Sequence, residues 1–464
     1  MLIDSHVHLN MHQFADDLDD VVSRARSSGV GEMLQVCYDA RSIDETIALT
    51  ERYPEVYGAV GIHPHDAKSW SDDLEKKVAD GLSGRRILAV GEMGLDYYRD
   101  LSPRDTQREV FKRQIRIALL RKKPVIIHSR EAFPDVIAVL REEGASEVGG
   151  IFHAFPGGAD EAREVLELGF LIGIGGPLTY KNSKLPELAA RLPSSSFVLE
   201  TDCPYLPPEP YRGRRNEPAH VAIVRDRLAE IRGVDPVDIE RAAEANYRRL
   251  LHRERKPASA VAYTLKGSIY VNATGACTNN CTFCLRNRRN ALFYGYNLIL
   301  VTDPTVHDMI EAVSSLASAA PYREIVFCGY GEPTCRVADV LKAAAALRKY
   351  ALPLRLDTNG HGNMINRRDI VPELANAFDG ISISLNAHDK ESYVRLCRPD
   401  AGEKAFDAVI DFIRRVAGSR MECTVTALDH PDVNIEACRA LVASIPGARF
   451  RVRRFHLVDG GRQA

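Results

Sequence analysis

The sequence predicts an α/β protein of two barrel domains, an N-terminal (β/α)8 TIM barrel and a C-terminal partial (β/α)6 barrel. Two observations lead to this prediction. The chain has 464 residues, about twice the length that one hydrophobic core supports. Short apolar runs alternate with amphipathic, helix-like segments along almost all of it.

The first half of the chain contains apolar runs with the length and spacing of buried parallel strands. Between the first two runs, apolar residues recur at helical spacing from Phe14 to Ala25, before Gly29 ends the helix. An open doubly wound sheet is the alternative, but no glycine-rich dinucleotide fingerprint follows the first strand. A closed barrel is therefore favoured. The predicted strands are Leu2–His8, Glu32–Tyr38, Val56–His63, Ile87–Gly94, Pro124–Ser129, Gly149–Phe155, Gly169–Ile174 and Phe197–Cys203.

The second half repeats this rhythm with fewer units, which predicts a partial barrel that is open on one side. The boundary is predicted at "HRERKPASA", residues 252–260, where charge density peaks and Pro, Ala and Ser follow a helix. We expect domains at 1–252 and 264–464, joined by a linker at 253–263. The predicted strands are Ser268–Ala273, Glu324–Cys328, Pro353–Asp357, Gly380–Leu385, Met421–Ala427 and Ala448–Leu457.

Bulk composition indicates a cytoplasmic protein with no membrane partner. Hydrophobic content is 45%, charged content is 27% and the formal net charge is −2, so any anion-binding site must be local. No basic and apolar leader opens the chain, and no apolar run approaches the ~20 residues that span a bilayer. A reducing compartment argues against a disulfide framework in a chain this large.

Polar side chains collect at the carboxyl ends of the predicted first-half strands, which converge on one face of a barrel. His6 and His8, two apart on a strand, point to the same side and can bind one ion. Imidazole and carboxylate ligands suit zinc, manganese or iron better than magnesium. A carboxylate can bridge two ions, and Glu92, midway in the set, is the natural bridge. The strand-end residues are His6, His8, His63, His65, Glu92, His128, His153 and Asp202.

Motifs in the first 252 residues resemble the TatD family of metal-dependent deoxyribonucleases. They are, in order, "DSHVHLN", "GIHPHDA", "VGEMGLDYY", "PVIIHSR", "FHAFPGG", "LETDCPYL" and "RGRRNEPAHV". The resemblance implies a hydrolase-type TIM barrel with two divalent ions (Zn, Mn or Mg). It assigns His6, His8 and Asp202 to one metal, His128 and His153 to the other, and Glu92 to the bridge between them.

The same resemblance implies phosphodiester hydrolysis, typically 3′-to-5′ removal of nucleotides from DNA, so DNA or a nucleotide is the expected substrate. Asp202 would orient the water and accept its proton, while His63 would steady the phosphate. Arg212, Arg214 and Arg215 on the loop "YRGRRNEP" could add a phosphate-binding patch, or could simply pair with acidic neighbours such as Glu217. Related barrels hydrolyse amides and esters, so the substrate stays open.

Three closely spaced thiols, in "CTNNCTFC", carry a second kind of chemistry. A structural zinc site needs four ligands, and no second C-x2-C or H-x3-H pair lies downstream. A disulfide would leave one thiol over. A [4Fe–4S] cluster bound by Cys277, Cys281 and Cys284 would leave one iron open to a non-protein ligand. The remaining second-half cysteines lack tight spacing and are expected to be packed thiols.

This cysteine pattern, with Phe283 before the last thiol, resembles the radical S-adenosylmethionine (SAM) superfamily. "FCGYGEPT" resembles the segment that meets the methionine amino group, with Glu332 as acceptor, although Tyr330 stands where glycine is commoner. "LDTNGHG" and "SISLNAHD" look like ribose and carboxylate contacts. The cofactor-binding residues implied are Cys277, Cys281, Cys284, Phe283, Gly329, Gly331, Glu332, Asn359, Ser384 and Asn386.

The leading interpretation is therefore a bifunctional enzyme, a two-metal phosphodiesterase joined to a radical SAM enzyme of unknown substrate. An electron donor of flavodoxin or ferredoxin type is the expected partner of the cluster. Two alternatives stay open. The barrel could hydrolyse an amide or ester made or used by the radical domain, or the cluster domain could act as a sensor that regulates the nuclease without turnover.

Overall fold

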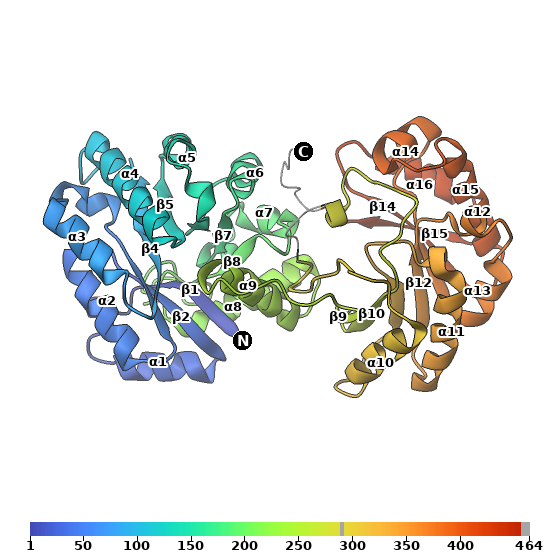
Figure 1. The fold of residues 1–464 in the computed structure, drawn as a ribbon, viewed down its shortest axis with the longest axis horizontal. Helices are drawn as coiled ribbons and strands as arrows, with labels where there is room; N and C mark the ends of the chain where they lie inside the picture. The colour runs from blue at the N-terminus through green and yellow to red at the C-terminus, as the bar shows by residue number, and fades with distance from the viewer. Residues whose placement is uncertain (288–291, 456–464) are drawn as a thin grey trace. The chain divides into compact units, whose positions relative to one another are not determined.

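The computed structural model describes residues 1–287 and 292–455 in two compact units (Figure 1). The first is formed by Met1–Lys256 and the second by Pro257–Phe455. In the first, helices surround one eight-stranded sheet that runs in the order β1 to β8. Its strands are β1 (Leu2–Val7), β2 (Val30–Val36), β3 (Val56–Val60), β4 (Ile87–Asp96), β5 (Val125–Arg130), β6 (Gly150–Phe152), β7 (Leu171–Ile174) and β8 (Phe197–Leu199). Its helices are α1 (Leu18–Ser27), α2 (Ala40–Arg52), α3 (Asp72–Gly81), α4 (Arg104–Arg121), α5 (Phe133–Glu142), α6 (Ala159–Glu167), α7 (Leu185–Arg191), α8 (Val221–Arg232) and α9 (Pro236–Leu251).

The sheet closes into a barrel where the segment after β8 meets β1. Val7 and Cys203 form a parallel bridge, and the His8 backbone N–H donates to the Cys203 carbonyl at 2.9 Å. The Asp202 N–H donates to the His6 carbonyl at 3.0 Å. The predicted (β/α)8 barrel is confirmed. These closing bonds come from the segments that carry His6, His8 and Asp202, so closure of the barrel brings these residues together.

The floor of the barrel is apolar and its opposite end is polar. Each strand contributes a buried side chain to one interior cluster, which Tyr247 and Leu251 of α9 cover. A floor packed in this way holds the strands in fixed register, so that polar residues at the carboxyl ends occupy fixed positions. The strand residues of the cluster are Ile3, Leu34, Val36, Ala59, Ala89, Ile126, Ile151, Leu171 and Val198.

Element bounds differ from expectation mainly at the ends of strands. The predicted strand Gly149–Phe155 ends at Phe152, and Phe197–Cys203 ends at Leu199, because the chain leaves the sheet to bring His153 and Asp202 to the rim. The predicted helix from Phe14 begins only at Leu18, after a short 3-10 turn at His12–Phe14.

The second unit holds a seven-stranded sheet in the order β15-β14-β13-β12-β11-β10-β9. The run from β10 to β15 is parallel, as the predicted partial barrel requires, and helices pack on one face. Its strands are β9 (Ala262–Leu265), β10 (Ser268–Asn272), β11 (Ile325–Cys328), β12 (Leu354–Thr358), β13 (Gly380–Ser384), β14 (Glu422–Leu428) and β15 (Ala448–Arg453). Its helices are α10 (Val306–Ala317), α11 (Val337–Leu347), α12 (Gly362–Asn366), α13 (Val371–Ala377), α14 (Lys390–Cys397), α15 (Lys404–Ala417) and α16 (Ile435–Ala443).

The antiparallel strand β9 was not predicted. It pairs with β10 through a two-residue turn, in which Lys266 has φ 54° and Gly267 has φ 66°. Positive φ at both central residues is the hairpin geometry that matches strand twist. The Lys266–Gly267 pair was the feature of the sequence from which this turn could have been predicted. Leu457, the predicted end of the last strand, lies outside the described residues. Across the described ranges, no helix combines the length and apolarity that a membrane crossing needs.

Candidate functional site

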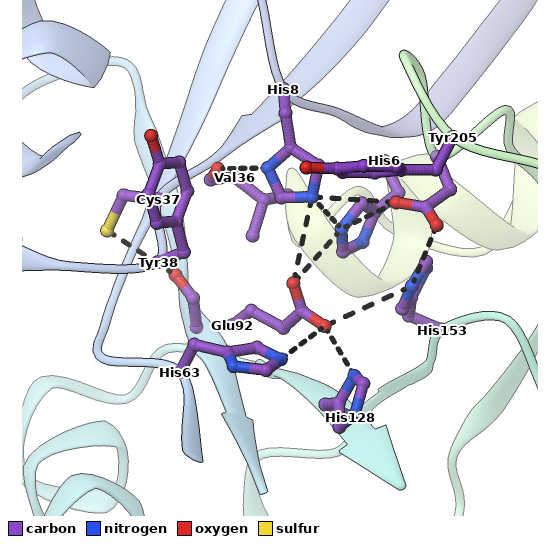
Figure 2. A network of polar contacts seen from close by, with 12 residues as sticks. His6, His8, Val36, Cys37, Tyr38, His63, Glu92, His128, His153 and Tyr205 are labelled. Carbon is purple, nitrogen blue, oxygen red and sulfur yellow. Dashed lines mark hydrogen bonds and ion pairs between the residues drawn. The ribbon is translucent and has the colours of Figure 1, made fainter. Parts of the chain in front are cut away.

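Histidines and carboxylates from six parts of the barrel converge at the carboxyl ends of its strands (Figure 2). The predicted ligands His6, His8, Glu92, His128, His153 and Asp202 all meet there, together with His63. Within them, three overlapping groups have ligand atoms that all lie within 4.8 Å of one another. The groups are His6, His8 and Glu92; His6, His153 and Asp202; and His63, Glu92 and His128.

One oxygen of Glu92 faces the first histidine pair. Glu92 Oε2 lies 3.4 Å from His6 Nε2 and 3.8 Å from His8 Nε2, and these two nitrogens lie 3.2 Å apart. Asp202 Oδ1 lies 3.9 Å from His6 Nε2 and 3.5 Å from His8 Nε2. Two imidazole nitrogens and two carboxylates thus surround one small volume, a donor set that suits a divalent cation.

The other oxygen of Glu92 faces a different set of histidines. Glu92 Oε1 lies 2.9 Å from His128 Nδ1, 3.8 Å from His63 Nε2 and 4.0 Å from His153 Nε2. His153 Nε2 is also 3.8 Å from Asp202 Oδ2, so His153 lies between the two groups of ligands. The Glu92 carboxylate therefore presents one oxygen to each side, as a bridging ligand must.

Hydrogen bonds on the outer side of His8 and His63 decide which nitrogen of each ring faces the centre. His8 Nδ1 lies 2.9 Å from the Val36 carbonyl, which can only accept, so the Nδ1 proton is held there and the Nε2 lone pair faces inward. His63 is arranged the opposite way. Its Nδ1 accepts from the His65 backbone N–H at 3.1 Å, so a neutral His63 carries its proton on the inward Nε2. His8 is therefore set up as a ligand, and His63 as a donor.

Asp96, which the sequence argument did not single out, orients His128. It is fully buried, and its Oδ2 lies 3.2 Å from His128 Nε2 and 2.8 Å from His65 Nε2. Its Oδ1 accepts from the Tyr98 and Arg99 backbone N–H groups at 3.0 and 2.8 Å. A carboxylate on Nε2 leaves the Nδ1 lone pair of His128 to face Glu92. Its place at the end of β4 was the feature of the sequence from which Asp96 could have been predicted.

Glu200 lies beside the outer nitrogen of His153. Its buried Oε1 lies 3.3 Å from His153 Nδ1 and accepts from the Ala154 N–H at 2.6 Å. This leaves His153 Nε2 facing Asp202 and Glu92. Glu200 directly follows β8 and precedes Asp202 by two residues in "LETD", so its place at the strand end was the feature that could have predicted it.

The electrostatic field of the site favours positive charge. Burial would raise the pKa of Glu92, but the neighbouring His128 and His6 rings hold it well below its usual range. Burial acts in the opposite direction on His153, yet the charges of Glu200 and Asp202 raise its pKa to about 10. Carboxylates that stabilise an imidazolium in this way also favour a divalent cation. The residues present therefore fit a two-metal centre.

The arginine loop at 211–215 is only partly available to a substrate. Arg215 donates to Asp17 at 2.7 and 2.8 Å and to Glu217 at 2.7 Å, so it braces the loop. Arg212 lies 4.4 Å over the ring of Tyr180. The side chain of Arg214 is exposed.

The cysteine loop follows β10 in the second unit. Cys277, Cys281 and Cys284 are free, partly exposed thiols. Burial raises the pKa of Cys277 to about 11, and it also raises the pKa of Cys284. The nearby Cys281 thiol adds to both increases. Three unpaired thiols on a short loop are a donor set that fits an iron–sulfur cluster.

The glycine-rich segment after β11 packs on the start of this loop. A Cβ at Gly331 would lie 2.2 Å from the Thr274 carbonyl oxygen, so only glycine permits the contact. The Glu332 N–H donates to the Ala276 carbonyl at 2.7 Å. The Glu332 carboxylate is buried and accepts from Thr334, from the Thr358 hydroxyl at 2.7 Å and from the Asn359 N–H at 2.6 Å.

A buried histidine, His361, ties the cysteine loop to its surroundings. Its Nδ1 lies 2.8 Å from the Thr278 hydroxyl and its Nε2 lies 2.9 Å from the Tyr393 hydroxyl. Asn359 donates to the same Thr278 hydroxyl at 3.0 Å. Burial lowers the pKa of His361 to about 4, so the ring is neutral at physiological pH. The sequence argument named Asn359 but not its neighbour His361.

The other predicted cofactor contacts lie at several points around the sheet. The Phe283 ring is 6.1 Å from that of His430, on the loop after β14. Ser384 ends β13 and is partly exposed. Asn386 is buried, and its side chain accepts from the Leu428 N–H at 3.1 Å. Gly329, with φ 133°, approaches the Asn272 side chain. Their roles toward a cofactor stay predictions.

A closed (β/α)8 barrel with a histidine and carboxylate cage at its strand ends defines a metal-dependent hydrolase. The family model described as TatD related DNase matches residues 3–252, more than half of the chain, and the chain belongs to this family. The Radical SAM superfamily model matches residues 271–445. The protein is thus a TatD-type metal-dependent hydrolase fused to a radical SAM domain, and both families are enzymes.

Three similar proteins match the hydrolase part of the chain. A metal-dependent hydrolase of Bacillus subtilis, YabD, is 41% identical over 251 residues, which are 54% of this chain and 98% of that protein. The 3′-5′ ssDNA/RNA exonuclease TatD of Citrobacter koseri is 34% identical over 255 residues, 54% of this chain and 98% of that protein. The crystal structure of YJJV, a TatD homologue from Escherichia coli, has 31% identity and a TM-score of 0.52, covering 54% of this chain and 98% of that chain.

Proposed function

We propose that residues 1–252 hydrolyse phosphodiester bonds at two divalent cations and remove nucleotides from the 3′ end of single-stranded DNA. The observation that carries the proposal is the Glu92 carboxylate, whose two oxygens face two different sets of histidines. The likeness to an exonuclease of single-stranded DNA and RNA supports the substrate class. His6, His8 and Asp202 would hold one cation, and His128 and His153 the other.

When bound, the cations would neutralise the phosphate and activate the attacking water. Side chains of the protein would carry out the remaining steps. Asp202, whose pKa lies below its usual value because of nearby His153 although burial acts to raise it, stays ionised and accepts the proton of that water. His63 donates from Nε2 to a phosphate oxygen, in keeping with its tautomer.

The test uses the purified full chain with manganese and single-stranded DNA labelled at the 5′ end. We expect shortening from the 3′ end with release of mononucleotides, and loss of that release in His153→Ala. His307→Ala, an exposed histidine of the other unit, is the matched control. Full activity in His153→Ala would contradict the assignment. A wild type silent on DNA but active on amides or esters would favour the alternative hydrolase reading.

For the second unit we propose a radical SAM enzyme. Cys277, Cys281 and Cys284 would hold a [4Fe–4S] cluster, and the segment after β11 would contact SAM. When bound, the cluster would supply the electron that cleaves SAM reductively. The chain's task is to hold the cysteine loop through Thr278, Gly331 and their partners, and to keep cofactor and substrate in line. A ferredoxin- or flavodoxin-type protein would deliver the electron.

Two measurements test this second activity. Anaerobically purified protein should carry about four irons per chain, given three thiolate ligands and one open iron. With dithionite and SAM it should release 5′-deoxyadenosine. His153→Ala should leave that release intact, because the two sites are proposed to act independently. Iron loading without SAM cleavage would favour a sensor domain instead.

A further inference from the structure

The helix-free face of the second sheet carries a row of arginines on its edge strand, β15. Pairing register fixes their direction. Cys423 and Val425 of β14 are buried against the helices and pair with Ala448 and Phe450 of β15, which pack on the same side. The alternate residues of β15, Arg449, Arg451 and Arg453, therefore point to the opposite, solvent-accessible face, hereafter the concave face.

Two of these arginines form no ion pair with a described residue. On β12, Arg355 pairs with Glu324 at 3.0 Å and with Asp357, and on β15 Arg449 pairs with Glu422 at 2.9 Å. Among the described residues, Arg451 and Arg453 form no ion pair.

Like charges two residues apart on one face of a strand repel each other. Both side chains are exposed, and they lie nearest the carboxyl end of β15, the end of a parallel sheet at which ligands bind.

The same end of β15 lies beside the cysteine loop. Phe455, two residues beyond the strand, contacts His430 at 4.5 Å between ring centroids, and His430 contacts Phe283 of the loop at 6.1 Å. His430 Nδ1 accepts from the Asp432 N–H at 3.1 Å, which leaves a donor N–H on Nε2 of the neutral ring.

Burial raises the pKa of the Cys328 thiol of β11, and the charge of Arg453 acts to lower it. The unpaired arginines and the proposed cluster site therefore share one region of the concave face.

We propose that Arg451 and Arg453 bind phosphates of a single-stranded oligonucleotide and hold it on the concave face, beside the cysteine loop. Guanidinium forks match phosphate oxygens, and side chains two residues apart on a strand are separated by roughly 6.6 Å, which suits successive phosphates. Binding of the oligonucleotide at β15 does not depend on the proposed radical chemistry. The proposal rests on that chemistry only where it names the oligonucleotide as the substrate of the second unit. Both halves of the chain would then act on nucleic acid.

Photocrosslinking of the full chain tests the site directly. The probe is single-stranded DNA of about 12 nucleotides that contains 4-thiothymidine, with EDTA present to prevent hydrolysis, and a parallel arm uses 4-thiothymidine monophosphate. We expect cross-linked peptides from Pro257–Phe455 that include β15, in addition to any from the hydrolase unit. Cross-links confined to Met1–Lys256 would overturn the proposal. Labelling of β15 by the mononucleotide alone would overturn the oligonucleotide assignment.

The double variant Arg451→Glu and Arg453→Glu should lower the cross-linking yield in β15 about tenfold, because two attractions become repulsions. The control, Arg395→Glu with Arg414→Glu, changes the charge equally on the exposed surfaces of α14 and α15. Charged side chains on an edge strand also protect it from aggregation, and glutamate keeps that protection. An unchanged cross-linking yield in the double variant would therefore mean that the arginines only protect the edge strand, and would overturn the proposal.

SAM cleavage in the same preparation is scored separately. Cross-links at β15 without cleavage would refute the radical chemistry and leave the binding site standing.

Discussion

Replacing Asp96 by Asn tests whether residues outside the metal cage set its affinity. The substitution keeps size and shape but removes the charge. It also replaces one of two acceptor oxygens that serve His65, His128 and two backbone N–H groups. An amide nitrogen at the Oδ2 position would face an imidazole N–H. His128 would then be free to turn its Nδ1 away from Glu92.

The size of the effect follows from these contacts. Loss of a partner that orients a ligand histidine typically costs about 10- to 100-fold in metal affinity or activity. That is about 1.4–2.7 kcal/mol, similar to one hydrogen bond to a charged group. Because Oδ1 can still accept from the Tyr98 and Arg99 N–H groups, we expect the fold to survive with a smaller loss of stability than of metal affinity.

Manganese titration of Asp96→Asn by calorimetry, with DNA hydrolysis measured at saturating metal, gives the comparison. Asp73→Asn, an exposed residue of α3, is the matched control. We expect weaker binding of the cation held by His128 and partial rescue of hydrolysis by excess manganese. Metal affinity within twofold of the control would refute the view that Asp96 orients His128.

Three further predictions concern Glu200, His361 and Cys281. Glu200→Gln should weaken the metal site about tenfold while SAM cleavage is unchanged; equal losses in both activities would indicate misfolding instead. His361→Phe should reduce iron per chain after reconstitution and speed loss of the cluster in air, because Thr278 and Tyr393 lose their shared partner; unchanged iron content would contradict this role. In cluster-free protein near neutral pH, iodoacetamide should alkylate Cys281 before Cys277. A hydrogen bond from Cys397 lowers the pKa of Cys281, whereas burial raises that of Cys277 to about 11, and only the thiolate reacts. Mass spectrometry of the peptides decides the order, and alkylation of Cys277 should rise as pH approaches its pKa.

Local patterns predicted the strands of both domains well because the period of apolar residues follows from burial on two sides of a parallel sheet. They failed where a few residues decide the conformation. The Lys266–Gly267 turn forms a hairpin only because both residues adopt positive φ, and β9 was missed for that reason. At β6 and β8 the strands end early, since the chain turns to bring His153 and Asp202 to the rim.

The candidate ligands could be predicted from the sequence alone, because strand ends of a barrel must converge and the motifs place histidine or carboxylate at six of the eight. Only the tertiary structure decided what each ring can do. The Val36 carbonyl orients His8 as a candidate ligand, and Asp96 does the same for His128. The backbone N–H of His65 leaves His63 as a candidate donor. The charge row of β15 likewise became visible only through its register with β14. The physical reason is shared: a hydrogen-bond partner or a facing strand is set by distances in space, which no spacing along the chain encodes.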